Sequence, residues 1–268
     1  MIFKSFLPFI GIGLLLLSLL SRKRAVGALG WMFFIVYCAY ELSYYLTKGE
    51  YFEGSAAFLF FAYTVLLTAL MLKPDSMLRD KDEEDLLFTI TRISLITAVF
   101  YFPFSEIIVN GRPILGELLI YATTKITAYV LDLFNVGIFT VYPAHIYSSQ
   151  NPLLGITIIL DCTAIQSMVL FTGLAFGVNA PWESKLKAFA ASVPTIYALN
   201  IVRNVFVTAA YFEQWFGAQS FEIAHGVLAK LFVMVSLIAV TYAVFIILPE
   251  SLNLIEDFFR LLLRKRQD

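Results

Sequence analysis

The sequence is poor in residues that form disulfides or bind metal ions. It has two cysteines and two histidines among 268 residues. Cys38 and Cys162 are too few for a disulfide framework, and neither they nor His145 and His225 show the C-x-x-C or H-E-x-x-H spacing of a metal site. We therefore expect no metal ion and no cofactor. The sequence also has no internal repeat, which excludes repeat architectures.

Charged residues are also scarce. They make up 15% of the chain, whereas hydrophobic residues make up 60%. A soluble domain of this length could not bury so much apolar surface, so the composition indicates a polytopic membrane protein. The formal net charge of -1 points to neither an acidic nor a basic partner, and we expect no nucleic acid. The basic clusters Ser21–Arg24 and Arg264–Arg266 lie beside apolar runs and are interpreted as topology anchors.

Apolar runs of the length that crosses a bilayer recur along the chain. They predict an all-α fold with about seven to eight transmembrane helices. We expect a single integral membrane domain over 1–268, with N-terminal helices in 1–110, a core in 111–248 and an amphipathic tail in 249–268. The charged segment Lys73–Asp85 stays outside the bilayer. The candidate spans are Phe6–Leu20, Ala25–Leu46, Ser55–Leu72, Leu86–Val109, Thr163–Ala180, Leu186–Tyr211 and Gly226–Leu248.

Residues Leu115–Val136 show a different pattern. Their polar side chains share one helical face and their apolar side chains take the other, which predicts an amphipathic helix. Such a helix lies in the membrane interface or lines a wet cavity. The polar face carries Glu117, Thr124, Asp132 and Asn135, and the apolar face carries Leu118, Leu119, Ala122, Ile126, Tyr129, Leu133 and Val136.

The basic residues predict the orientation of the spans. The tail Phe258–Arg266 is expected on the cytoplasmic side, and counting back from it places His225 and Cys162 on the outer side. Counting the spans forward from the N-terminus, with the cluster 21–24 on the cytoplasmic side, gives the same orientation only if residues 115–136 do not cross the membrane. We favour that arrangement, because in the alternative the cluster breaks the positive-inside rule. The first span is interpreted as a retained signal anchor, since its basic cluster follows the apolar core.

A short β-structure is expected before Cys162. Between Gly137 and Leu160, two β-branched runs flank the turn signal Ser148–Pro152, which predicts a hairpin. Bare hairpin edges would be unsatisfied in hydrocarbon, so the hairpin should lie at the outer face, packed on helices. Cys162 is then expected to open a helix, where unpaired amide groups favour the nucleophilic thiolate. Asp161 is expected to cap that helix.

Arg203 lies deep in a predicted span, about 12 Å below the end at Tyr211. An arginine at such a depth costs about 2.5 kcal/mol or more and usually faces a polar interior. Asn200 and Asn204 share or border its face, which indicates an inward polar stripe. The alternative is that Arg203 snorkels to the interface as a structural contact.

Three residues together suit acyl transfer better than any of them does alone. A buried cysteine is usually a small hydrophobic group, which is our interpretation of Cys38. Acyl transfer needs a thiolate, a group that carries a proton and a cation for the developing oxyanion. Cys162 could supply the thiolate, His225 could carry the proton, and Arg203 could supply the cation. His145, in the predicted hairpin, is the alternative proton carrier, although a residue on a span is held more rigidly than one on a loop.

Three sequence segments resemble the signatures of the exosortase/archaeosortase family, and of its archaeosortase A branch in particular. They are "DCTAIQSM" (Asp161–Met168), "VPTIYALNIVRNVFV" (Val193–Val207) and "SFEIAH" (Ser220–His225). The resemblance extends from about Leu115 to Val235, whereas the N-terminal spans match only in being hydrophobic. Part of the archaeosortase branch has arginine at the third position, so the histidine here follows the exosortase-like pattern.

The resemblance implies a membrane-embedded cysteine transpeptidase in the cell membrane. Substrates of the family are secreted proteins whose C-terminal sorting signal has a short motif, a transmembrane helix and a basic tail. In the archaeosortase A branch the motif is Pro-Gly-Phe, typical substrates are S-layer glycoproteins, and cleavage is coupled to attachment of the new C-terminus to a membrane lipid. The alternatives are a non-enzymatic transporter or scaffold, and a membrane protease that only hydrolyses.

The same resemblance implies roles for the individual residues. Cys162 attacks the scissile carbonyl and forms a thioester, Arg203 stabilises the oxyanion, and His225 transfers the proton. A lipid amine then resolves the thioester. The supporting residues are Asp161, Thr163, Gln166, Asn200 and Asn204.

Overall fold

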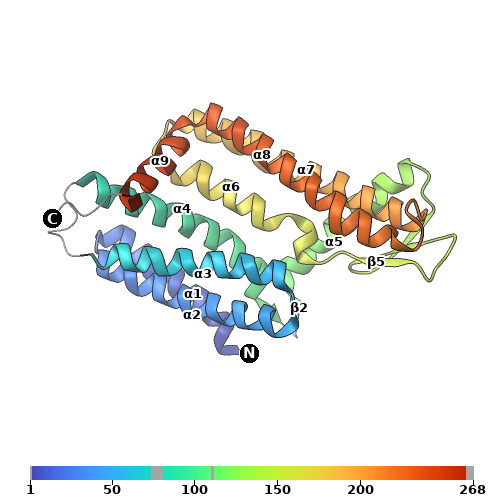
Figure 1. Cartoon of the computed structure of the whole chain (residues 1–268), viewed down its shortest axis with the longest axis horizontal. Helices are drawn as coiled ribbons and strands as arrows, with labels where there is room; N and C mark the ends of the chain where they lie inside the picture. Colours follow the sequence, from blue (N-terminus) through green and yellow to red (C-terminus); the bar gives the residue numbers. More distant parts are fainter. Residues whose placement is uncertain (1, 74–80, 110–111, 264–268) are drawn as a thin grey trace. The chain divides into compact units, whose positions relative to one another are not determined.

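The computed structural model describes residues 2–73, 81–109 and 112–263 (Figure 1). Helices predominate among them. The chain divides into two compact units, which are described separately. The first unit comprises 1–102, 176–179 and 250–268, and the second comprises 103–175 and 180–249.

The first unit consists of long helices around an apolar core. Trp31 lies at its centre and packs against Phe34 and, edge-on, against Tyr63, with ring centroids 5.8 Å apart in both pairs. Cys38 is half-buried against this core, as expected for a small hydrophobic group. The helices are α1 (Ile2–Ser21), α2 (Arg24–Lys48), α3 (Tyr51–Met71), most of α4 (Lys81–Glu106) and α9 (Pro249–Leu263).

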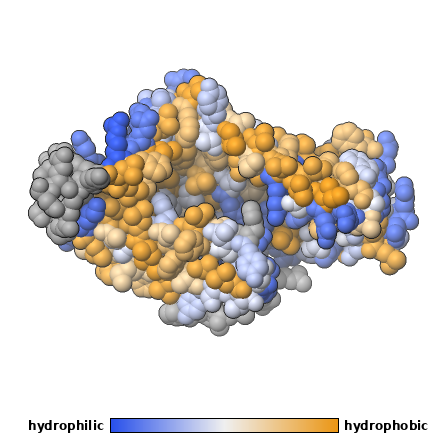
Figure 2. All heavy atoms as spheres, in the orientation of Figure 1, coloured by the Kyte–Doolittle hydropathy of each residue, from blue (hydrophilic) through white to orange (hydrophobic). Residues whose placement is uncertain are grey.

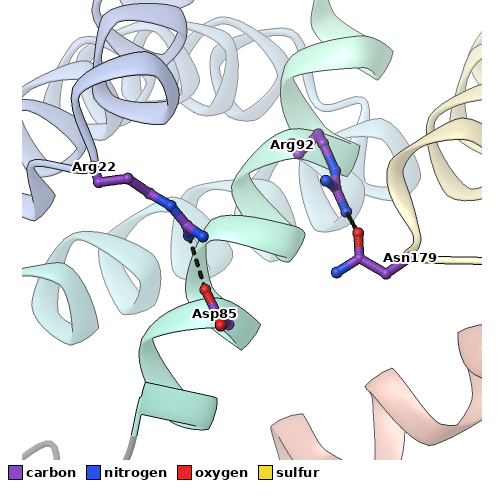
Figure 3. Close-up of polar contacts among 4 residues, drawn as sticks. All are labelled: Arg22, Asp85, Arg92 and Asn179. Carbon is purple, nitrogen blue, oxygen red and sulfur yellow. Dashed lines mark hydrogen bonds and ion pairs between the residues drawn. The ribbon is translucent and has the colours of Figure 1, made fainter.

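Polar contacts of two α4 side chains connect this helix with other parts of the first unit (Figure 3). Near the start of α4, Asp85 pairs with Arg22 at 2.9 Å. Further along, Arg92 donates from Nε to the carbonyl oxygen of Gly177 and from Nη2 to Oδ1 of Asn179, both at 2.6 Å. A guanidinium within an apolar helix needs such partners, because a charge without them is costly away from water. Arg92 therefore has a structural role that its sequence context did not reveal.

The second unit combines helices with a small antiparallel sheet. α7 and α8 pack side by side, and α5 packs on α7 (Figure 1). Its elements are β1 (Ile108–Val109), β2 (Arg112–Pro113), α5 (Ile114–Leu133), β3 (Ile138–Val141), β4 (His145–Ser148), β5 (Gly155–Thr157), the 3-10 helix η2 (Leu160–Thr163), α6 (Ile165–Gly177), α7 (Trp182–Phe212), the 3-10 helix η3 (Gly217–Gln219), the π-helix η4 (Glu222–Leu228) and α8 (Ala229–Ile247).

The predicted all-α polytopic fold is confirmed, because seven helices of the described chain are long and apolar enough to cross a membrane. The predicted span Thr163–Ala180 is the exception. Its helix α6 has 13 residues and is about 20 Å long, short of the bilayer core of about 30 Å. α5 is one of the seven, so the arrangement in which it crosses the membrane also meets the length requirement. Figure 2 shows hydrophobic side chains over much of the visible helical surface, as lipid-facing helices require.

The two faces of α5 agree only in part with the prediction. Leu118 and Tyr129 of the predicted apolar face are 65% and 66% exposed, and Thr124 of the predicted polar face is buried. Asp132 and Asn135 of the predicted polar face are exposed, however, and Val136 of the predicted apolar face is buried. The buried side of the helix also carries Thr123, whose hydroxyl lies 3.2 Å from the Tyr197 hydroxyl of α7. The helix ends three residues earlier than predicted, since residue 135, an asparagine, adopts the left-handed conformation (φ 58) that stops helices.

The predicted hairpin is present as part of a three-stranded sheet in the order β3-β4-β5. The turn at Ser148–Pro152 leads from β4 to β5, as predicted. The additional strand β3 pairs with β4 in antiparallel register, with Val141 opposite His145. Pro143 is the one strong turn residue between them, so the sequence signal for this second hairpin is weak.

The C-terminal helix α9 lies in the segment predicted as an amphipathic tail. Phe258 packs on the core of the first unit, whereas Arg260 is exposed beside Glu256 and Asp257. The basic residues Arg264–Arg266 lie outside the described residues, as does the stretch 74–80 of the charged segment.

Candidate active site

A cavity of about 590 Å³ in the second unit brings the three predicted catalytic residues together. Cys162, Arg203 and His225 all line it, although they come from η2, α7 and η4. The remaining wall is formed by β5, the end of α7 and the segment before η4. Its other lining residues are Gly155, Ile156, Thr157, Ile158, Asn204, Val207, Tyr211, Ala218, Gln219, Phe221 and Glu222.

Cys162 lies in the short 3-10 helix η2, close to the end of β5. The prediction that it opens the following helix is wrong by three residues, since α6 begins at Ile165. Ala164 separates the two helices with a left-handed backbone conformation (φ 57), which alanine adopts rarely. The thiol is half-buried and faces the cavity. The tight turn, rather than a helix start, therefore presents the sulfur.

Two asparagines hold the backbone of Cys162 against α7. Asn200 Nδ2 and Asn204 Nδ2 donate to the Cys162 carbonyl oxygen at 2.7 and 2.9 Å. Both side chains are buried, at 7% and 3% exposure, and lie one helical turn apart. The two bonds use both lone pairs of the carbonyl oxygen. The predicted polar stripe on this helix thus has a defined function, which is to position the cysteine.

Arg203 is hydrogen-bonded to one of the two asparagines that hold Cys162. Its Nη1 donates to Asn204 Oδ1 at 3.0 Å, so the Asn204 amide contacts both Arg203 and Cys162. Within the described part of the chain, no carboxylate forms an ion pair with this guanidinium. A guanidinium has five N–H donors, so most of them remain available to a ligand in the cavity.

His225 is held by aromatic stacking. Its ring lies parallel to that of Phe221, with an interplanar angle of 5° and centroids 5.0 Å apart, and Phe221 meets Tyr211 edge-on at 5.4 Å. The helical segment around His225 is a π-helix, a form often found at functional sites. Sequence reasoning missed both aromatic residues. The spacing of four between Phe221 and His225 was the available signal.

Of the five predicted supporting residues, Asn204 lines the cavity, whereas Asp161, Thr163, Gln166 and Asn200 do not. The Asp161 carboxylate accepts a hydrogen bond from the Gln166 side chain. Asp161 lies within η2, whereas α6 begins at Ile165, so the expectation that Asp161 caps the helix after Cys162 is wrong. Thr163 is buried and donates to the Leu160 carbonyl oxygen at 2.6 Å, which stabilises the turn.

His145 contacts the cavity wall without lining the cavity. Its Nδ1 lies 2.9 Å from the hydroxyl oxygen of Thr157, which does line the cavity. Among the described residues, no group of three His, Cys, Asp or Glu side chains could hold a metal ion.

The fold and the cavity define a polytopic membrane protein with a thiol, a guanidinium and an imidazole in one pocket. Residues 4–242 match the transmembrane exosortase family, and the chain belongs to it. This confirms the resemblance seen in the sequence.

Two curated relatives are similar in sequence. Archaeosortase A of Haloferax volcanii is 35% identical over 39% of this chain and 40% of its own length. Archaeosortase A of Natronomonas pharaonis is 29% identical over 65% of this chain and 62% of its own length. The chain thus spans less than two thirds of the length of each relative. No solved structure matches the chain.

Proposed function

We propose that this protein is a cysteine transpeptidase of the cell membrane that processes secreted proteins with a C-terminal sorting signal. The observation that carries the proposal is that Cys162, Arg203 and His225 line one cavity although they come from three separate elements. Membership of the exosortase family and similarity to two archaeosortases A support it. A transporter or scaffold would not require a thiol in this position.

The proposed reaction has two steps that share one site. The Cys162 thiolate attacks the scissile carbonyl, and Arg203 donates hydrogen bonds to the oxyanion. His225 gives a proton to the leaving amine, and the acyl group remains on sulfur as a thioester. His225 then accepts a proton from the incoming nucleophile, whose attack on the thioester releases the thiolate.

The substrate signal is proposed to consist of a Pro-Gly-Phe motif, a transmembrane helix and a basic tail, as on S-layer glycoproteins. A membrane lipid amine is the proposed acceptor, so the product is a lipid-anchored protein. With the C-terminus of the enzyme in the cytoplasm, the cavity opens at the extracellular side, where the motif of such a substrate emerges. Exclusion of water from the thioester would favour transfer over hydrolysis.

The test is to co-express the protein with a reporter that carries this signal and to measure the mass of the reporter's new C-terminus. A lipid adduct that depends on Cys162 is the expected result. Cys162→Ala and the matched variant Cys38→Ala distinguish the cavity thiol from the half-buried thiol of the first unit. A shortened reporter without lipid would indicate simple hydrolysis, and an intact reporter would overturn the proposal.

A further inference from the structure

We infer that the free edge of β5 binds the substrate as an added β-strand and leads its scissile bond to Cys162. This inference rests on the proposed function and specifies how the substrate is recognised. The sheet order β3-β4-β5 places β5 at an edge. Residues of β5 line the same cavity as the thiol, so this edge opens into the site.

The register of the sheet shows which backbone groups of β5 point away from β4. Ile156 lies opposite Ile146, and the flanking bonds run from Ser148 N to Leu154 O at 3.0 Å and from Ile158 N to Ala144 O at 2.8 Å. Hydrogen-bonded and non-bonded pairs alternate along an antiparallel ladder. Ile156 therefore bonds to β4, whereas the N–H and C=O groups of residues 155 and 157 point away from it.

These outward groups have no recorded partner among the residues that the structure describes. Backbone groups without partners are costly away from water, and proteins usually protect an exposed strand edge. Here the edge is left open beside a nucleophile. An extended peptide would satisfy it by β-strand addition, a recurrent mode of peptide recognition.

Gly155 shows that this strand is fixed closely against its neighbour. A Cβ atom at residue 155 would lie 2.4 Å from Cε1 of Tyr147, so the Tyr147 ring occupies the space of a side chain. That ring stacks on Phe139 of β3 with centroids 5.4 Å apart. The aromatic pair therefore supports β5 from the side of the sheet and leaves its outer edge uncovered.

The chemistry of the edge selects the conformation of its ligand. A helix pairs its backbone groups internally, so a substrate's transmembrane helix cannot use this edge. An extended segment next to that helix can, with hydrogen bonds from every second residue. A cavity of about 590 Å³ is of ordinary size for a ligand pocket and takes only a short stretch of chain. The ligand is thus the short extended motif that precedes the substrate helix.

The test uses synthetic peptides with the Pro-Gly-Phe motif, an apolar helix and a basic tail. Single backbone amides around the motif are N-methylated in turn, which removes one N–H donor each. Binding to the Cys162→Ala protein in lipid nanodiscs is measured by fluorescence anisotropy, and cleavage by the wild-type protein is measured in parallel. Methylation should weaken binding about tenfold at alternate positions and leave the intervening positions within about threefold.

Proline substitutions test the edge from the protein's side. Thr157→Pro removes an amide on the free edge of β5, and an edge strand tolerates proline there. Thr140→Pro removes an outward amide on the opposite edge of the same sheet, at a residue that does not line the cavity, and serves as the control. Thr157→Pro should weaken binding of the unmodified peptide about tenfold, whereas Thr140→Pro should not change it.

The possible results separate the two proposals. Cleavage of the unmodified peptide without any alternation in the methylation series would overturn strand addition and leave the proposed function standing. If methylation weakens binding at alternate positions but the peptide is not cleaved, strand addition at β5 is supported and the proposed transpeptidase activity is contradicted. If Thr157→Pro does not fold, the methylation series on the unaltered β5 still decides.

Discussion

Asn200→Ala and Asn204→Ala remove different numbers of hydrogen bonds from the site, so we expect effects of different size. Among the described residues, Asn200 donates to the Cys162 carbonyl oxygen alone, whereas Asn204 donates to that oxygen and also accepts from Arg203. A hydrogen bond contributes about 1 kcal/mol net, and more where its loss leaves a buried group unpaired. We therefore expect destabilisation by about 1 kcal/mol for Asn200→Ala and about 2 kcal/mol for Asn204→Ala.

The effect on turnover should exceed the effect on stability. Loss of Asn204 releases the guanidinium as well as the cysteine backbone, and loss of one donor to an oxyanion costs about 100-fold or more in kcat. We expect a fall in kcat of about tenfold for Asn200→Ala and about 100-fold for Asn204→Ala. Asn253→Ala, at an exposed position of α9, is the control and should change neither quantity.

The assay is single-turnover cleavage by protein in nanodiscs, with thermal unfolding measured on the same samples. The double variant should lose less than the sum of the single variants, because both asparagines act on one oxygen atom. Equal effects of Asn200→Ala and Asn204→Ala would refute the bridging role of the second residue. Unchanged turnover in both would show that the carbonyl contacts serve stability alone.

Three further predictions concern the cavity side chains. Cys162→Ala should abolish processing of the substrate while the protein still inserts and folds, and the control Cys38→Ala should stay active. Processing by the Cys162→Ala variant would exclude the thiol mechanism. Arg203→Lys should lose most activity, because lysine keeps the charge without the planar fork of donors. A near-normal kcat together with lower stability would show that Arg203 has a structural role instead. In pH–rate profiles, His225→Gln should lose the ionisation of the proton-transferring group, whereas His145→Gln should keep it. The reverse result would assign proton transfer to His145.

The helices could be predicted because a bilayer imposes one strong requirement on sequence. Backbone groups must be paired within the segment, so about 20 apolar residues in a row become a helix whatever surrounds them. The same requirement pointed to Arg203, because a charged side chain deep in a membrane span is costly and usually has a function. Which face of α5 packs on protein follows less directly, since the buried Thr123 and Thr127 lie outside the predicted polar face, and Thr123 meets Tyr197 of α7.

The details of the turn at Cys162 could not be predicted, because they depend on distant partners. The left-handed Ala164 has no local sequence signal, as alanine favours helices. The turn is held by Asn200 and Asn204 from a helix about 40 residues later, and one sequence does not reveal that pairing. Strand β3 was missed for a related reason: its pairing with β4 stabilises it more than its own composition does.

The two asparagines also have a consequence for how the protein responds to its membrane. α7 has 31 residues and is about 46 Å long, well beyond a bilayer core of about 30 Å, and long helices adjust to thickness by tilting. Arg203 is part of this helix, and Cys162 is bound to it through Asn200 and Asn204. A change in tilt therefore moves the cation and the nucleophile as one body. Lipids of different chain length should alter how deep the site lies without altering the distance between its two reacting groups.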